Sequence, residues 1–142
     1  MDNTFYEDLA RGVKVEELLV TKLREKYPCA TIITAYKGYD IWVPEINKSI
    51  EVKYDPMSNK TGNIVVEIEY NGKPSALMTT TADYWVFYDD SIFVMLTPKQ
   101  IIACIFACKL SYVEFTGNGD NKPKKAFLIP KEILFNSGKP FK

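Results

Sequence analysis

The sequence predicts an α+β fold, and three observations support that class. A helical period near the N-terminus is followed by a series of β-branched runs separated by turn residues, and a second helical run lies further along. The chain has 142 residues, which suits one full-sized core, so residues 1–142 are expected to form a single domain. Hydrophobic residues make up 46% of the chain and charged residues 25%, as in most globular domains. We therefore expect helices flanking one central mixed sheet.

The first predicted helix covers about residues 5–27. Apolar residues recur at Leu19, Val20 and Leu23 with the period of one helical face, and Pro28 is expected to end the helix. Strands are predicted where period-two or β-branched runs are bounded by glycine, proline or asparagine. The predicted strands cover residues 29–36, 40–43, 49–55, 64–70, 83–89, 91–96, 111–115 and 126–130.

Turn and cap residues place the remaining elements. Residues 57–63 are expected to form a loop, and the Asn-Gly-Lys-Pro sequence at 71–74 is a strong turn signal. Ser75 is a candidate cap for a short helix over residues 76–82. Thr97 followed by Pro98 matches the cap and first position of a helix, so a second long helix is expected over residues 98–110.

Composition excludes several classes of chemistry. Formal net charge is zero, which gives no overall attraction to nucleic acid, although a basic groove could exist locally. The chain has no histidine, which excludes Ser-His and Cys-His nucleophiles, and its three cysteines form no metal-ligand pattern. Trp42, Tyr84 and Trp85 are expected in the core or an interface rather than as base-stacking surfaces. Without a signal peptide or a membrane-length apolar run, we expect a cytoplasmic protein with no membrane partner.

The most informative stretch is a predicted hairpin made by residues 40–43 and 49–55. Strand periodicity places Glu51 and Lys53 on one face, and Asp40 opens the neighbouring strand. Two carboxylates held side by side repel each other, and a divalent cation would offset that cost. Mg²⁺ suits a site of one or two carboxylates with water and phosphate. A lysine beside it could position a water or stabilise charge that develops on phosphate.

Each of these residues also has an ordinary interpretation. Glu51 and Lys53 would equally suit an exposed strand face, and Asp40 follows a turn glycine. Glu16 lies on the apolar stripe of the first helix, where an unpaired charge is costly. A metal shared with Asp40 and Glu51 would compensate that charge, unless Glu16 merely lies at the edge of the stripe.

The order of these residues resembles the PD-(D/E)XK nuclease superfamily. Its signature is an acidic residue followed by acidic-x-lysine on the next strand, as in "GYD" and "IEVK" here. The resemblance implies a restriction-endonuclease-like αβββαβ core, with Asp40 and Glu51 as metal ligands and Lys53 as the catalytic lysine. Val52 would add its backbone carbonyl. Glu16 is similar to the first-helix glutamate that Holliday-junction resolvases of this superfamily add to the site.

The resemblance covers most of the chain and departs from the motif at one position. Tyr39 stands where the motif has a proline, a residue that shapes the backbone and holds no ligand. Residues 60–88 look like the segment that follows the motif in small phage and bacterial nucleases. Residues 116–130 look like a C-terminal element of those chains.

These resemblances imply a Mg²⁺-dependent endonuclease that hydrolyses DNA, with Mn²⁺ as a substitute and no organic cofactor. Branched DNA such as a recombination junction is one expected substrate, and a homodimer would pair two cuts on opposite strands. A phage-encoded chain would act in the host cytoplasm. One alternative is a nucleic-acid-binding or protein-interaction module on a nuclease scaffold that no longer cuts. Another is a metal-free structural domain with its acidic residues scattered over the surface.

Further polar residues are candidates for the edge of such a site. Glu67 could help hold a metal or its water, or could face solvent on an outer strand. Ser75, Thr79 and the threonines after it could donate hydroxyls to phosphate, or could serve as turn and cap residues. Lys73 and other loop lysines could meet a nucleic-acid backbone, or could only favour solubility.

Overall fold

The computed structural model describes residues 3–34, 36, 38–116 and 121–141. Within them the α-helices are α1 (Asn3–Leu23), α2 (Ser58–Thr61), α3 (Pro98–Ala107) and α4 (Lys131–Ser137), and the 3₁₀ turns are η1 (Pro44–Ile46) and η2 (Ala76–Met78). The strands are β1 (Thr31–Ile32), β2 (Ile41–Val43), β3 (Lys48–Tyr54), β4 (Asn63–Tyr70), β5 (Lys73–Pro74), β6 (Tyr84–Tyr88), β7 (Phe93–Leu96), β8 (Val113–Phe115), β9 (Lys124–Pro130) and β10 (Lys139–Phe141). No helix in the described part is long and apolar enough to cross a membrane.

The strands form two sheets. The six-stranded sheet has the order β1-β2-β3-β6-β7-β10 and is mixed, because β3 and β6 run parallel while its other neighbouring pairs are antiparallel. The second sheet, β5-β4-β9-β8, is antiparallel. The predicted α+β class with a mixed sheet is therefore confirmed, whereas the expectation of one central sheet is wrong. Strand periodicity identifies β4 as a strand, but its partner β9 lies too far along the chain for a local pattern to reveal it.

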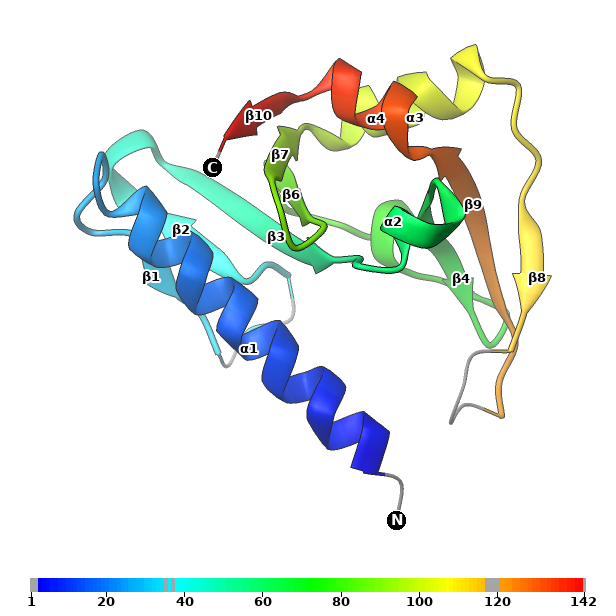
Figure 1. The fold of residues 1–142 in the computed structure, drawn as a ribbon, viewed down its shortest axis with the longest axis horizontal. Coiled ribbons are helices and arrows are strands. Elements are labelled where there is room, and N and C mark those ends of the chain that lie inside the picture. Colours follow the sequence, from blue (N-terminus) through cyan, green and yellow to red (C-terminus); the bar gives the residue numbers. More distant parts are fainter. Residues whose placement is uncertain (1–2, 35, 37, 117–120, 142) are drawn as a thin grey trace.

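The six-stranded sheet is covered on both faces. Figure 1 shows α1 lying beside β1, β2 and β3, with the second sheet on the other side of the molecule. On β6, Val86 packs with Leu19 of α1 in one hydrophobic cluster. Its neighbours Trp85 and Phe87 point the opposite way and pack with Ile64 of the second sheet and with α3 and α4. This alternation gives the protein two cores, one on each side of the six-stranded sheet.

Two neighbouring parallel strands need a long connection, which is usually an α-helix. The connection between β3 and β6 is built differently. It consists of α2, β4, β5 and η2 in place of one long helix, so it supplies two strands of the second sheet. The short helix expected over residues 76–82 is reduced to the single turn η2. Ser75 precedes that turn without capping it, because its hydroxyl donates a hydrogen bond to Glu67.

The first helix and strand are shorter than the sequence predicts. Helix α1 ends at Leu23, and residues 24–27 continue as turns in which the Tyr27 N–H donates to the Leu23 carbonyl at 2.7 Å. Pro28 disfavours a helical conformation in the residue before it, which accounts for the early end. Of the predicted strand 29–36, only β1 is a strand within the described residues, and position 35 lies outside them.

Residues 57–63, expected as a loop, contain the short helix α2. The Asp55 carboxylate accepts a hydrogen bond from the Ser58 N–H at 3.2 Å, and the Ser58 hydroxyl donates to the Asp55 carbonyl at 2.7 Å. Gly62 ends the turn with a φ of 74°, a left-handed conformation that glycine adopts without steric cost.

The second long helix begins as predicted. The Thr97 hydroxyl accepts from the Gln100 N–H at 3.1 Å, and the Gln100 side chain accepts from the Thr97 N–H at 2.8 Å, which together form a capping box. Helix α3 ends at Ala107 instead of residue 110, and Lys109 has a φ of 52°, a conformation that cannot continue a helix. The strands predicted over residues 83–89 and 91–96 are also present as β6 and β7, which pair antiparallel.

Candidate active site

The β2–β3 hairpin places Asp40 and Glu51 side by side. Ile41 pairs with Ile50 and Trp42 with Ser49, and the register ends there. The Asp40 N–H donates to the carbonyl of the same Ile50 at 2.9 Å, so Asp40 lies just before β2 at an irregular end of the ladder. The two carboxyl groups are close enough for Asp40 to contribute to the raised pKa of Glu51. The predicted hairpin and its pair of carboxylates are therefore both present.

Strand β2 does not extend past Asp40, and the Asp40 side chain takes the place of the next backbone partner of β3. Its Oδ2 accepts a hydrogen bond from the Val52 N–H at 2.7 Å. The N–H and C=O of one strand residue point toward the same neighbouring strand, so the Val52 carbonyl also points to this open edge. The Asp40 carboxylate is thus oriented by the backbone of β3, close to a peptide oxygen that could serve as a ligand.

Lys53 is held between a carboxylate and an aromatic ring. Its Nζ lies 3.7 Å from Glu51 Oε1 and 5.1 Å from the centroid of the Trp85 ring. The Glu51 side chain is 20% exposed and the Lys53 side chain 38% exposed. The lysine therefore has a fixed orientation while its ammonium group can still reach a substrate.

Glu16 approaches the same edge from α1. It is half-buried, and burial together with the charge of Asp40 raises its pKa to about 7. Burial also raises the pKa of Glu51 to about 7, with contributions from Asp40 and Glu16 and an opposing effect of Lys53. Mutual repulsion of this kind requires short separations between the carboxyl groups. Glu16 thus lies within electrostatic range of Asp40 and Glu51, although these three carboxylates do not form a group that could hold a metal ion among the described residues.

These groups fit a hard divalent cation as a partial set of ligands. Asp40 and Glu51 supply carboxylate oxygens and Val52 a carbonyl oxygen, which are the ligand types that Mg²⁺ takes together with water and phosphate. A cation between the carboxylates would also relieve the repulsion that raises the pKa of Glu51. Across the residues that the structure describes, however, no three acidic or cysteine side chains form a complete metal cage. Water or substrate would have to complete the coordination.

A polar hollow of about 320 Å³ lies against Glu51 and Lys53, between β3 and the segment that follows β4. We call it the acidic hollow. Its lining consists of Tyr36, Gly38, Glu51, Lys53, Glu67, Ala76, Thr79, Thr80 and Thr81. Side chains from β3 and β4 thus face the same hollow, although 13 residues lie between Lys53 and Glu67 in the sequence.

Of the residues suggested for the edge of the site, some line the hollow and one does not. Glu67 lines the hollow, where its Oε2 accepts from the Ser75 hydroxyl at 2.7 Å and its Oε1 lies 3.8 Å from Lys124 Nζ. Thr79 also lines it. Lys73 does not, because it lies on β5 and is exposed, paired across the strands with Tyr70.

The structure adds residues that the sequence did not indicate. Tyr36 and Gly38 line the hollow, and the ring of Trp85 contacts the Lys53 ammonium. Trp85 lies in the core as expected, at 1% exposure, but its contact with Lys53 depends on the parallel pairing of β3 with β6. The β-branched pattern of the sequence predicts both β3 and β6, but it does not indicate that the two strands are neighbours.

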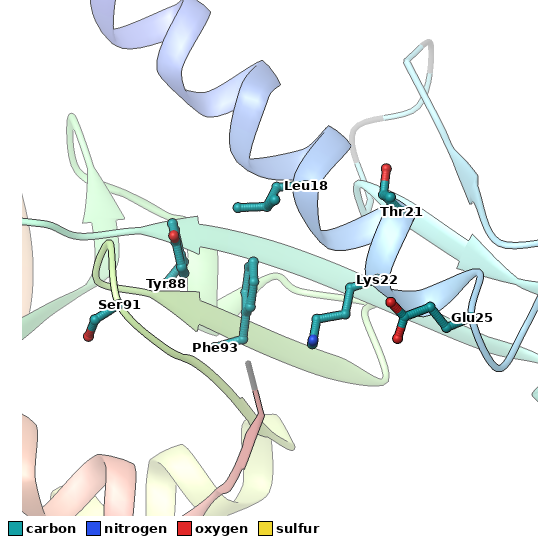
Figure 2. A pocket seen from close by; sticks show the side chains of 7 residues that line it. All are labelled: Leu18, Thr21, Lys22, Glu25, Tyr88, Ser91 and Phe93. Carbon is teal, nitrogen blue, oxygen red and sulfur yellow. The ribbon is translucent and has the colours of Figure 1, made fainter.

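Two other hollows lack this chemistry. One of about 290 Å³ lies between α1 and the β6–β7 hairpin, and of its charged side chains Lys22 comes from the last turn of α1 and Glu25 from the turn after it (Figure 2). The other, of about 500 Å³, is bordered by α3 and lined mainly by apolar side chains, among them Leu77, Ile105 and Phe127. Neither combines two carboxylates with a lysine, so the acidic hollow is the stronger candidate.

No family model, curated protein or solved structure matches the chain. Membership of the PD-(D/E)XK superfamily is therefore a hypothesis that rests on Asp40, Glu51 and Lys53 and on the strands that carry them. The geometry of this site is the basis for any statement about function.

Proposed function

We propose that the chain is a divalent-metal-dependent endonuclease that hydrolyses DNA phosphodiester bonds, with Asp40, Glu51 and Lys53 as its catalytic residues. One observation carries the proposal. Asp40, just before β2, is oriented by the Val52 N–H and interacts with Glu51, and the Lys53 ammonium lies 3.7 Å from the Glu51 carboxylate beside a polar hollow. Paired carboxylates with an adjacent lysine suit the in-line attack of water on a phosphodiester.

The residues would divide the work as follows. Asp40, Glu51 and the Val52 carbonyl would hold Mg²⁺, or Mn²⁺ in its place, with Glu16 as a further carboxylate. The bound cation would supply positive charge to the phosphate oxygens as negative charge develops there. Lys53, oriented by Glu51, would donate hydrogen bonds to the attacking water or to a phosphate oxygen. The water oxygen bonds to phosphorus, the bond to the 3′ oxygen breaks, and the leaving oxygen takes up a proton.

The opposite wall of the acidic hollow would position the substrate. Thr79 could donate its hydroxyl to a phosphate oxygen, and Glu67, held by Ser75 and Lys124, would border the metal or its water. A homodimer in the cytoplasm would allow two cuts on opposite strands. A preference for branched DNA depends only on the resemblance of Glu16 to the resolvase glutamate.

A second candidate function is a nucleic-acid-binding module that no longer cuts. It is favoured by one observation, namely that no complete metal cage is formed among the residues that the structure describes. Binding without cleavage under every metal condition would support it.

Cleavage assays separate the two. Supercoiled plasmid, branched DNA and a matching RNA are incubated with the chain in Mg²⁺, Mn²⁺ or EDTA. We expect metal-dependent cleavage that is lost in Asp40→Ala, Glu51→Ala and Lys53→Ala, with circular dichroism showing that each variant is folded. Glu69→Ala is the control, because Glu69 pairs with Lys125 outside the hollow and should not affect cleavage. Absence of cleavage in all conditions would refute the proposed function.

A further inference from the structure

Three aromatic side chains, which we call the aromatic row, lead to the acidic hollow. The rings of Tyr36 and Tyr39 meet edge to face with centroids 5.0 Å apart. The rings of Tyr39 and Trp42 follow at 6.1 Å. Tyr36 also lines the hollow with Glu51 and Lys53. The row therefore ends at the proposed catalytic groups.

Strand alternation places the row on the same face as those groups. Ile41 and Val43 are buried in the core beneath α1, so Trp42 between them projects to the opposite face. Glu51 and Lys53 alternate in the same way with residues packed toward α1, and they share the face of Trp42. A chain lying along the row would thus reach Lys53 without crossing an edge of the sheet.

The rings of the row are accessible to solvent to different degrees. Tyr36 is 53% exposed, and Tyr39 and Trp42 are half-buried. Trp85, by contrast, is 1% exposed. Trp42, expected in the core or an interface, is half-buried.

Tyr36 is held in place although it is exposed. A Cβ atom at Gly38 would lie 2.3 Å from the Tyr36 ring and 2.7 Å from Thr81 Oγ1, so the absence of a side chain lets the ring rest there. The Thr81 hydroxyl in turn donates to the Gly38 carbonyl at 3.3 Å. These contacts fix the ring at the mouth of the hollow.

We propose that the aromatic row is a stacking platform for unpaired nucleotides, so that the substrate strand enters the acidic hollow single-stranded. This inference rests on the proposed function and names the class of substrate. Bases stack on aromatic rings in single-stranded binding sites with little dependence on sequence, whereas the faces of bases within a duplex are covered by their neighbours. The hollow, at about 320 Å³, is at the small end of ligand sites and is lined by hydroxyl groups that suit a phosphate.

The charge of the protein favours binding by base stacking and not binding of a duplex on a basic surface. Formal net charge is zero, and among the described residues Lys53, which lines the hollow, and Lys124, which contacts Glu67 there, are each paired with a glutamate. Binding that depends on stacking with few phosphate contacts should weaken only modestly as salt is raised. A broad basic groove would give a steep dependence.

Tryptophan fluorescence of the full chain provides the test. The chain has two tryptophans, and Trp85 contacts Lys53 of the hollow, so the Trp42→Phe variant is titrated in parallel to show which part of a change in emission comes from Trp42. A thymidine dodecamer and a duplex of equal length are titrated in EDTA, where no metal-dependent cleavage occurs. We expect the dodecamer to quench emission and to bind at least tenfold more tightly than the duplex. Equal affinity for both, or no quenching, would overturn the proposal.

Variants locate the contact. Tyr36→Ala should weaken dodecamer binding roughly tenfold, the loss expected for one stacked base, while Tyr36→Phe should retain affinity. Gly38→Ala should also weaken binding, because it displaces the Tyr36 ring. Tyr112→Ala is the matched control, since Tyr112 is 52% exposed but contacts Lys125 near β8. Equal effects of Tyr36→Ala and Tyr112→Ala would refute the assignment.

The same assay distinguishes this inference from the proposed function. Asp40→Ala should abolish cleavage but keep dodecamer binding and the quenching of Trp42. If the wild-type chain binds the dodecamer yet cuts nothing, the platform stands and the nuclease proposal fails. If it cuts a fully paired duplex as readily as one with an unpaired segment, the nuclease proposal stands and the platform is wrong.

Discussion

Replacing Glu51 by glutamine should stabilise the metal-free chain at neutral and alkaline pH. Burial, Asp40 and Glu16 raise the pKa of Glu51 from 4.5 to about 7, so the folded chain carries this carboxylate in its charged form only at a cost. Glutamine has nearly the same shape without the charge. The substitution therefore removes a repulsion that the folded state contains and the unfolded state does not.

The size of the effect follows from the change in pKa. Each pKa unit corresponds to about 1.4 kcal/mol, so a rise from 4.5 to about 7 sets an upper limit of about 3 kcal/mol for the cost of ionised Glu51. The pKa of about 7 already contains the opposing effect of Lys53, so the loss of that ion pair is not subtracted again. We expect a net gain of up to about 3 kcal/mol in the free energy of unfolding near pH 8.

The direction with pH is equally specific. Between pH 4.5 and about 7 the folded chain binds more protons at Glu51 than the unfolded chain does, so its stability falls as the pH rises. The advantage of Glu51→Gln should accordingly be small near pH 5 and complete near pH 8. Glu16 adds to the same trend in the wild type, because its pKa is also raised to about 7.

Urea unfolding in EDTA at these two pH values measures the effect, with Glu69→Gln as the control outside the hollow. Mg²⁺ provides a second measurement, since it should raise the unfolding midpoint of the wild type near pH 8 more than that of Glu51→Gln. A stability difference that is the same at both pH values would refute the electrostatic explanation. So would a Glu51→Gln variant that is less stable than the wild type near pH 8.

Lys131→Met should lower the free energy of unfolding by about 3 kcal/mol near pH 7, because it removes the ammonium group that lies 2.6 Å from the buried Asp89 carboxylate. A loss below about 1 kcal/mol in urea unfolding would contradict this. Thr97→Ala removes the capping box of α3 and should cost about 1 kcal/mol, measured in the same way, and an unchanged stability would argue against the cap. Glu67→Ala should reduce cleavage at least tenfold while Glu69→Ala leaves it unchanged, although both glutamates lie on β4, are 29% exposed and pair with a lysine. Equal rates for these two variants would remove Glu67 from the site.

Local signals predicted the parts of the fold that depend on neighbours in sequence. The hairpin of β2 and β3 follows from two β-branched runs and a short connection, and the start of α3 follows from Thr97 and Pro98. The second sheet could not be predicted, because β4 pairs with β9 about 60 residues away. Helix α2 depends on hydrogen bonds between Asp55 and Ser58, which a composition-based assignment to a loop does not take into account.

The candidate site shows the same division. Asp40, Glu51 and Lys53 could be selected because one hairpin and a period of two residues determine their relation. Tyr36 and Trp85 could not be selected, since their contacts with the site arise from the turn before β2 and from the β3–β6 pairing. Sequence periodicity therefore identified the charged groups, while tertiary structure determines which surfaces surround them.

Strand β3 connects the stability of the core to the geometry of the proposed site. Its Val52 side chain packs toward α1, while the N–H of the same residue orients the Asp40 carboxylate at 2.7 Å. On the opposite face, Trp85 fills the core and also supports the ammonium of Lys53. Because both orienting contacts come from groups fixed by the core, Asp40 and Lys53 hold their positions before any substrate arrives. Substrate binding then need not supply the free energy to order them, which is the condition under which electrostatic groups are most effective in catalysis.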